Sequence, residues 1–326
     1  MARVFRGATK GLAWLLLASV AALLAFRIAA WAREDGAAPP ATTSFLVTRY
    51  GKIAVQLSGP ETGPRVVLLH GTAAWSGFWR DVSAHLAGKG WRVIAVDTPP
   101  FGFSDRDPLA RYSRQEQAKR LSDILTATGR ATIVGHSFGA GAGLELALRE
   151  PDKVEALVLV AAALGQLDPP PDENAAARLV SVGPLAQAVV GASVTNPLLT
   201  ETLLKSFIHR KDAAANWVDT LEAPMRREGS TSAYAAWLPN LLATADGAIS
   251  RSHLRLRGIT VPVAVIWGEA DRVTPIQQGK SLAALIRARS MILLPDVGHI
   301  QHIEAPKAFL AALDQSLATV RKTGKQ

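Results

Sequence analysis

The five residues 135–139 constrain the fold of this chain more than any other feature. They read Gly-His-Ser-Phe-Gly, they directly follow an apolar run at 131–134, and they precede a small-residue stretch at 140–149 that is typical of a helix. A strand, a sharp turn and a helix around Gly-x-Ser-x-Gly predict a nucleophile elbow with Ser137 at its apex. The two glycines are needed there because any side chain would collide with the adjoining strand or helix. An ordinary turn is the plainer interpretation of the same five residues.

Short apolar runs alternate with helical segments along most of the chain. The runs are typical of strands buried on both faces, and they lie at residues 65–70, 92–96, 131–134, 154–160, 263–267 and 291–294. Residues 45–50 and 52–58 alternate around Gly51 and predict a hairpin. This order of elements predicts the α/β class, with a doubly wound, mostly parallel sheet.

The alternation stops between residues 164 and 250, where no strand-like run occurs. A stretch of this length is too long for a bare loop inside a compact domain. We therefore expect a helical cap at 164–250, inserted into a core that is formed by residues 45–163 and 251–326.

A serine hydroxyl is a weak nucleophile at neutral pH, so it needs a base, and the base needs an orienting acid. The acid candidate is Asp271, in the loop that leaves the C-terminal end of the run 263–267. Active-site residues gather at this end of the strands in open α/β sheets. The plainer interpretation of Asp271 is a helix cap ahead of Pro275. Two less favoured acids are Glu269 and Asp168.

The base candidate is His299, which follows the last apolar run. Gly298 before it allows the loop to turn the imidazole toward the elbow. His302 is the alternative base, but we expect it on the following helical turn. The order Ser137, Asp271, His299 along the chain is the order that accompanies this type of elbow.

The oxyanion of an acyl-transfer intermediate needs two N–H groups aimed at one point. One should belong to Phe138, the residue after the nucleophile. The other should come from the loop after the run 65–70, and we expect Thr72, with Ala73 as the alternative. His70 and His136 lie beside these groups, and we interpret both as structural residues that hold the loop and the elbow.

The motifs together resemble those of the α/β-hydrolase superfamily, in its capped branch. The matching pieces are His70-Gly71, Asp97 with the residues 101–105, the elbow 135–139, residues 268–275 and Gly298-His299. The resemblance spans residues 45–320 and implies a nucleophile at Ser137, an acid at Asp271 and a base at His299. Dehalogenases and epoxide hydrolases of the superfamily carry aspartate at the nucleophile position, so the serine argues against both. One departure is Pro100, where the family often has glycine.

These residues predict a serine hydrolase that cleaves a carboxylic ester, or a related acyl bond, of a small apolar or lipid-like substrate through an acyl-enzyme. The alternatives are a C–C bond hydrolase or a perhydrolase that uses the same triad, or a binding protein without activity. No metal or organic cofactor is needed for this chemistry. Four aromatic residues are predicted to bind substrate: Trp75, Phe207, Trp217 and Trp237. Their plainer interpretation is that they form the core of the cap.

The N-terminal residues 11–32 are apolar apart from Arg27, and Arg3, Arg6 and Lys10 precede them. As an α-helix this stretch would be about 33 Å long, which matches the thickness of the hydrocarbon core of a bilayer. We expect residues 1–33 to form a cytoplasmic stub and a single-pass anchor, followed by a linker at 34–44, with the rest of the chain outside the cytoplasm. The alternative is a signal peptide that is cleaved near Ala30-Trp31-Ala32, which would release a secreted protein.

Composition narrows the function further. The chain has no cysteine, which excludes disulfides, thiol catalysis and cysteine-ligated metals. The net charge is +9, but the charges form no blocks interleaved with aromatic residues, so we expect no nucleic-acid partner. A basic surface facing anionic headgroups is the better interpretation. The oligomeric state stays open.

Overall fold

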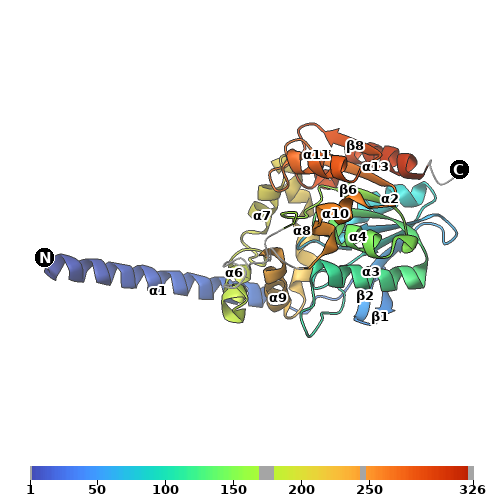
Figure 1. Cartoon of the computed structure of the whole chain (residues 1–326). Coiled ribbons are helices and arrows are strands. Elements are labelled where there is room, and N and C mark those ends of the chain that lie inside the picture. Colours follow the sequence, from blue (N-terminus) through green and yellow to red (C-terminus); the bar gives the residue numbers. More distant parts are fainter. Residues whose placement is uncertain (1, 169–179, 243–246, 322–326) are drawn as a thin grey trace.

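The structure, a computed structural model, describes residues 2–168, 180–242 and 247–321. Its centre is an eight-stranded sheet in the order β1-β2-β4-β3-β5-β6-β7-β8 (Figure 1). β1 and β2 form an antiparallel hairpin, β2 pairs antiparallel with β4, and all other neighbours are parallel. The predicted α/β fold with a mostly parallel sheet is confirmed. The strands are β1 (Thr43–Thr48), β2 (Gly51–Ser58), β3 (Arg65–Leu69), β4 (Arg92–Val96), β5 (Ala131–His136), β6 (Val154–Val160), β7 (Val263–Gly268) and β8 (Ser290–Leu294).

Helices cover both faces of this sheet, which explains why its strands are apolar throughout. Ile133 of β5 belongs to the core cluster that contains Leu144, whereas the next residue, Val134, belongs to the cluster that contains Leu313. Successive strand residues point to opposite faces, so both must be apolar when both faces are buried. The core helices are α2 (Arg80–Gly88), α3 (Arg114–Thr128), α4 (Phe138–Arg149), α11 (Ile276–Leu285), α12 (Gln301–Glu304) and α13 (Pro306–Arg321).

The described residues between β6 and β7 contain helices and no strand. The α-helices are α6 (Gly183–Ala192), α7 (Thr200–Phe207), α8 (Val218–Glu222), α9 (Ser230–Leu242) and α10 (His253–Arg257), and the longest 3₁₀ segment is η3 (Lys211–Trp217). Apolar side chains of α6, α7, α8 and α9 share one cluster with aromatic residues from the segments that follow the strands, such as Phe101 and Phe138. The proposed cap at 164–250 therefore rests on the edge of the sheet where the site was predicted. Its residues 169–179 and 243–246 lie outside the described residues.

The N-terminal segment forms one helix, α1 (Ala2–Arg33), which projects away from the rest of the chain (Figure 1). Its part Ala13–Arg33 is long and apolar enough to cross a membrane, which is compatible with an anchor or a signal sequence. The predicted linker 34–44 differs from a plain tether at both ends. Glu34 accepts hydrogen bonds from backbone N–H groups of the cap, and β1 already begins at Thr43, because the end of this segment pairs with β2.

Candidate active site

Ser137 lies between β5 and α4 in a backbone conformation that few residues other than glycine adopt, with φ 52° and ψ −117°. A Cβ added at Gly135 would lie 2.6 Å from the Cα of Ala140, and one added at Gly139 would lie 2.5 Å from the carbonyl oxygen of His70. Neither backbone contact can yield without moving the turn. The two glycines are therefore required by close packing, as the elbow predicts.

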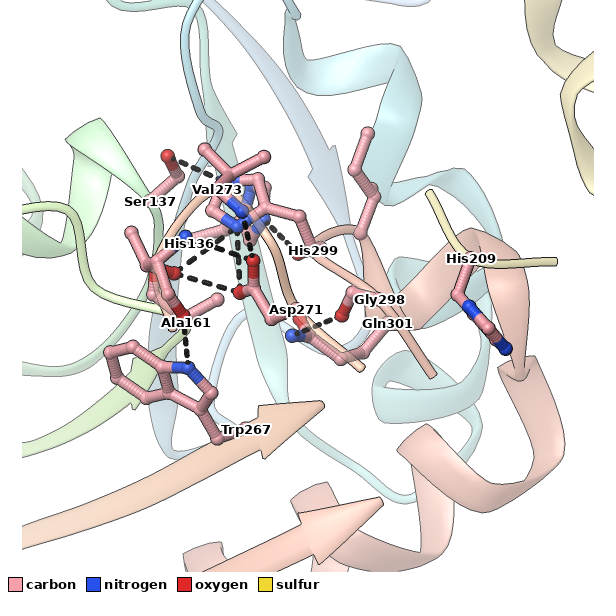
Figure 2. Close-up of polar contacts among 12 residues, drawn as sticks. His136, Ser137, Ala161, His209, Trp267, Asp271, Val273, Gly298, His299 and Gln301 are labelled. Atoms are coloured by element: carbon pink, nitrogen blue, oxygen red, sulfur yellow. Dashed lines mark hydrogen bonds and ion pairs between the residues drawn. The ribbon is translucent and has the colours of Figure 1, made fainter. Parts of the chain in front are cut away.

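Three side chains that are far apart in the sequence meet at this turn (Figure 2). Nε2 of His299 lies 3.0 Å from Oγ of Ser137, and Nδ1 of His299 lies 2.9 Å from Oδ2 of Asp271. A carboxylate accepts only, so Nδ1 carries the proton and Nε2 of the neutral ring is left as the acceptor for the Ser137 hydroxyl. All three residues are buried. This is the contact chain that proton transfer from the serine requires.

The loop after β7 holds the carboxylate of Asp271 in place. Its Oδ1 accepts from the N–H groups of Val273 at 2.8 Å and Thr274 at 2.9 Å, and its Oδ2 accepts from the Thr274 hydroxyl at 2.7 Å. The two alternative acids lie elsewhere. Glu269 is exposed, and Asp168 pairs with His253 on the surface.

His70 fixes the loop after β3. Its Nδ1 donates to the Gly71 carbonyl at 2.7 Å, since a carbonyl only accepts, and its Nε2 accepts from the Thr98 N–H at 2.9 Å. Burial lowers the pKa of His70 to about 4, so the ring is neutral at pH 7. This arrangement agrees with the structural interpretation of His70.

His136 and His302 flank His299 and are also buried. His136 donates from Nε2 to the His299 carbonyl at 2.8 Å, and burial lowers its pKa well below the usual value. His302 lies on α12, stacks on Trp79 with ring centroids 4.3 Å apart, and has its pKa lowered to about 3 by burial. Neither ring is positioned on Ser137, and each is neutral at pH 7.

The predicted oxyanion donors both lie on the wall of the cavity above Ser137, and so does the alternative, Ala73. Phe138 is the first residue of α4, and the first N–H groups of a helix have no partner within it. Thr72 follows Gly71, where an added Cβ would lie 3.1 Å from the Cβ of Ser137. The loop therefore passes close beside the elbow, as two convergent N–H donors require.

The cavity measures about 400 Å³ and has mostly apolar walls. The core contributes the residues around Ser137, and the cap contributes a set of apolar side chains: Val194, Leu203, Leu204, Phe207, Leu221, Met225 and Leu241. Of the four predicted substrate-binding residues, only Phe207 lines this cavity. A volume of this kind suits a small apolar ligand or one chain of a larger one.

The other three predicted substrate-binding residues pack inside the protein instead. Trp217 lies against Phe78 with ring centroids 5.4 Å apart, Trp237 lies against Phe138 at 5.5 Å, and Trp75 belongs to the same cluster. Their assignment to the cavity wall is corrected by this packing. Large aromatic side chains bury the most surface where the cap meets the core, and here Trp217 and Trp237 lie behind Phe78 and Phe138, which themselves line the cavity.

One important side chain was missed in the sequence. The carboxylate of Glu304, on α12, accepts hydrogen bonds from four backbone N–H groups: those of Gly298 at 2.8 Å, Ile300 at 3.0 Å, His209 at 2.7 Å and Arg210 at 3.1 Å. It therefore holds the residues on both sides of His299 and ties them to the cap. The only sequence signal for this role was the position of an acidic residue five residues after His299 and shortly before Pro306. The neighbouring residues do not reveal which distant N–H groups the carboxylate would bind.

Within the described ranges 2–168, 180–242 and 247–321, no three histidine or acidic side chains lie together in a way that could hold a metal ion.

The comparisons with known proteins agree with this fold. A family model described as the α/β hydrolase fold matches residues 64–306, and the chain belongs to this family. LipZ of Mycobacterium tuberculosis is 29% identical over 82% of this chain and 93% of that protein. The 2-hydroxymuconate semialdehyde hydrolase of Pseudomonas sp. (strain CF600) is 27% identical over 82% of this chain and 91% of its own length.

A solved structure of a bacterial membrane phospholipase A superposes with a TM-score of 0.66 at 22% identity, covering 99% of this chain and 100% of that one. At this identity the similarity concerns the fold alone. The relatives and the fold are those of hydrolases, and they include enzymes that act on different bonds.

Proposed function

We propose that this chain is a serine hydrolase that cleaves carboxylic esters of apolar substrates through an acyl-enzyme. The observation that carries the proposal is the buried contact chain from Ser137 through His299 to Asp271 at the floor of an apolar cavity. Each contact lies within the distance over which a proton is transferred.

The proposed reaction uses only groups of this chain. Oγ of Ser137 attacks the ester carbonyl while Nε2 of His299 takes its proton, and Asp271 stabilises the resulting imidazolium. The N–H groups of Phe138 and Thr72 bind the oxyanion. When the intermediate collapses, the C–O bond to the leaving alcohol breaks and His299 donates the proton to that alcohol. Water then attacks the acyl-enzyme with His299 as base, which releases the acid and restores Ser137.

The buried histidines around His299 favour this reaction because they stay neutral. The rings of His136 and His299 lie 5.0 Å apart between centroids. A positive charge at that distance would oppose formation of the imidazolium at His299. The lowered pKa values of His136 and His302 remove that repulsion at pH 7.

A C–C bond hydrolase is the second candidate, because relatives such as the 2-hydroxymuconate semialdehyde hydrolase act on that class of substrate. The two candidates differ in the leaving group, an alcohol or a carbanion, at the same triad. Comparing the turnover of p-nitrophenyl esters with that of a meta-cleavage dienoate separates them.

We also propose that α1 stays attached and anchors the chain in the membrane, with the catalytic residues on the extracytoplasmic side. Arg3, Arg6 and Lys10 precede the apolar stretch, and basic residues favour the cytoplasmic side. Ala30, in the predicted cleavage pattern, is 1% exposed and is packed as part of the folded protein. Protease protection of the intact chain in inverted vesicles tests the orientation.

The catalytic proposal is tested by labelling the full chain, in detergent, with a fluorophosphonate probe. We expect labelling of the unaltered chain and none of Ser137→Ala. Ser316→Ala is the matched control, because Ser316 is a buried serine on α13 outside the cavity wall, and it should be labelled normally. If Ser137→Ala is labelled like the control, another residue is the nucleophile and the proposal is wrong. If no protein is labelled, the proposal is also wrong and a binding function gains support.

A further inference from the structure

The last turns of α1 are packed against the cap. Ala30 is buried, and the Cα of Arg27 lies 3.5 Å from the point where a Cβ on Gly191 of α6 would be. Glycine at position 191 thus allows α1 and α6 to approach closely. Figure 1 shows α6 beside the end of α1, on the side of the domain from which the helix departs.

Charged side chains fix α1 in this position. Arg33 pairs with Glu222 of α8 at 3.1 Å and donates to the Thr195 carbonyl at 2.6 Å, and its side chain is only 9% exposed. Glu34 accepts from the N–H groups of Gly229 at 2.9 Å and Thr231 at 2.7 Å, at the start of α9. Paired groups at such sites are costly to separate, since each partner would be left buried without the other. The direction of α1 therefore sets the orientation of the cap.

The length of α1 then sets the depth of the cap. The part of the apolar stretch that precedes the contact with α6, residues 11–26, rises only about 24 Å, whereas a hydrocarbon core is about 30 Å thick. Tilting the helix would shorten its span further. The span must therefore extend past residue 26 into the last turns of the stretch 11–32, so the turns that pack on α6 must lie at the membrane surface. α6 must lie there with them.

Figure 1 places α6 and α7 at the end of the domain from which α1 departs, and exposed apolar side chains lie on and beside these helices. They lie on α6, on α7 and on the connections beside them, and one lies near the end of α9: Val182 is 54% exposed, Val189 40%, Leu198 76%, Leu199 37%, Phe207 38% and Leu241 50%. Phe207 and Leu241 also line the cavity, so they mark where it opens. Such side chains are costly in water and favourable in the interfacial region of a bilayer.

We infer that the cap rests in the interfacial region of the membrane and that the cavity opens toward the bilayer, so that an acyl substrate enters from the lipid phase. The inference rests on the proposed function and on the proposed anchor, and it names lipid-dissolved esters as the substrate class. The occupant of the apolar side of the cap is the bilayer itself. α1 supplies the argument for this occupant, because it holds these side chains at the depth where lipid begins.

The absence of cysteine allows a direct test of depth, independent of activity. Two variants of the full chain, Leu198→Cys and Val47→Cys, are each labelled with one environment-sensitive fluorophore at the new cysteine. The labelled proteins are then reconstituted in vesicles of phosphatidylcholine and phosphatidylglycerol. Val47 is the matched control because it is 79% exposed and lies on β1, far from α1 (Figure 1). We expect the fluorescence emission of the label at position 198 to be blue-shifted and to be quenched by lipids that carry a spin label near the headgroup. The label at position 47 should emit as it does in water and should not be quenched by these lipids. Two labels that are equally in water would overturn the inference.

A second measurement connects depth to catalysis. Leu198→Asp should lower turnover of a long-chain ester dissolved in the vesicles by on the order of tenfold, the effect of losing the burial of one leucine. It should leave turnover of a water-soluble short-chain ester unchanged, and Val47→Asp should affect neither. Equal turnover of the vesicle ester by Leu198→Asp and the unaltered chain would refute entry from the bilayer. If the unaltered chain cleaves neither ester, the proposed function fails, whereas the labels still report the depth of the cap.

Discussion

Replacing Glu304 by glutamine changes one oxygen of this buried side chain into an NH₂ group and leaves its size nearly the same. In the native protein Oε2 accepts from Gly298, His209 and Arg210, and Oε1 accepts from Ile300. If the amide oxygen keeps the three donors, the NH₂ group faces the N–H of Ile300. That donor then loses its partner, and the other three hydrogen bonds lose the negative charge that strengthened them.

The size of the effect follows from these contacts. A buried donor without a partner costs about 1–3 kcal/mol, so we expect Glu304→Gln to lower the free energy of unfolding by about 3 kcal/mol in all. Gly298 and Ile300 flank His299, so the imidazole should also shift relative to Ser137. A shift of about 1 Å in a catalytic group costs on the order of a hundredfold in rate, and we expect kcat to fall between about tenfold and a hundredfold with KM little changed.

The assay compares p-nitrophenyl ester kinetics and fluorophosphonate labelling rates at a temperature where the variant is folded. Glu145→Gln is the matched control, because Glu145 is also fully buried and accepts from the N–H groups of Ile249 and Ser250, away from His299. The control should lose stability and keep its labelling rate. A Glu304→Gln variant that is less stable but reacts at the unaltered rate would show that the carboxylate does not position His299.

Three further predictions concern the site. Gly139→Ala would place a Cβ 2.5 Å from the His70 carbonyl oxygen. We therefore expect the rate of fluorophosphonate labelling to fall at least about tenfold and the free energy of unfolding to fall by about 1–3 kcal/mol. An unchanged thermal unfolding curve would contradict this expectation. Asp271→Asn should lower kcat by on the order of 10⁴, because the amide oxygen keeps the N–H donors of Val273 and Thr274 and the NH₂ group then faces Nδ1 of His299, which favours the wrong tautomer. Full activity of this variant would remove Asp271 from the triad. Burial lowers the pKa of His302 to about 3, below its value of 6.5 in the unfolded chain, so its contribution to stability is complete above about pH 6.5 and is lost as the pH falls toward 3. Urea unfolding should therefore show that, between pH 7 and pH 5, the free energy of unfolding of His302→Phe falls by about 2 kcal/mol less than that of the unaltered chain.

Some features of the site could be predicted because their causes are local. The elbow around Ser137 depends on a strand, two glycines and a helix that are adjacent in the sequence, and the structure has this turn. Asp271 and His299 lie in the loops that follow β7 and β8, and the carboxyl ends of parallel strands meet at one edge of the sheet. Their convergence on Ser137 was thus predictable from the order of the elements.

The substrate-binding prediction failed at Trp75, Trp217 and Trp237 because a large aromatic residue has the same appearance in the sequence whether it lines a cavity or fills a core. Which of the two occurs depends on the segments that pack against it. Here the segments after β3 and β5 supply Phe78 and Phe138 as partners, so the tryptophans join the contact between cap and core.

The sequence by itself determined the class of fold, the position of the sharp turn that carries Ser137 and the presence of an apolar helix at the N-terminus. Local backbone preferences and side-chain periodicity decide these features, and both can be read from neighbouring residues. Only the tertiary structure decided that Glu304 holds the loop of His299 and that Arg33 and Glu34 join α1 to the cap. A buried charge is stabilised by donors or partners that approach from distant segments, and their identity depends on how the whole chain packs.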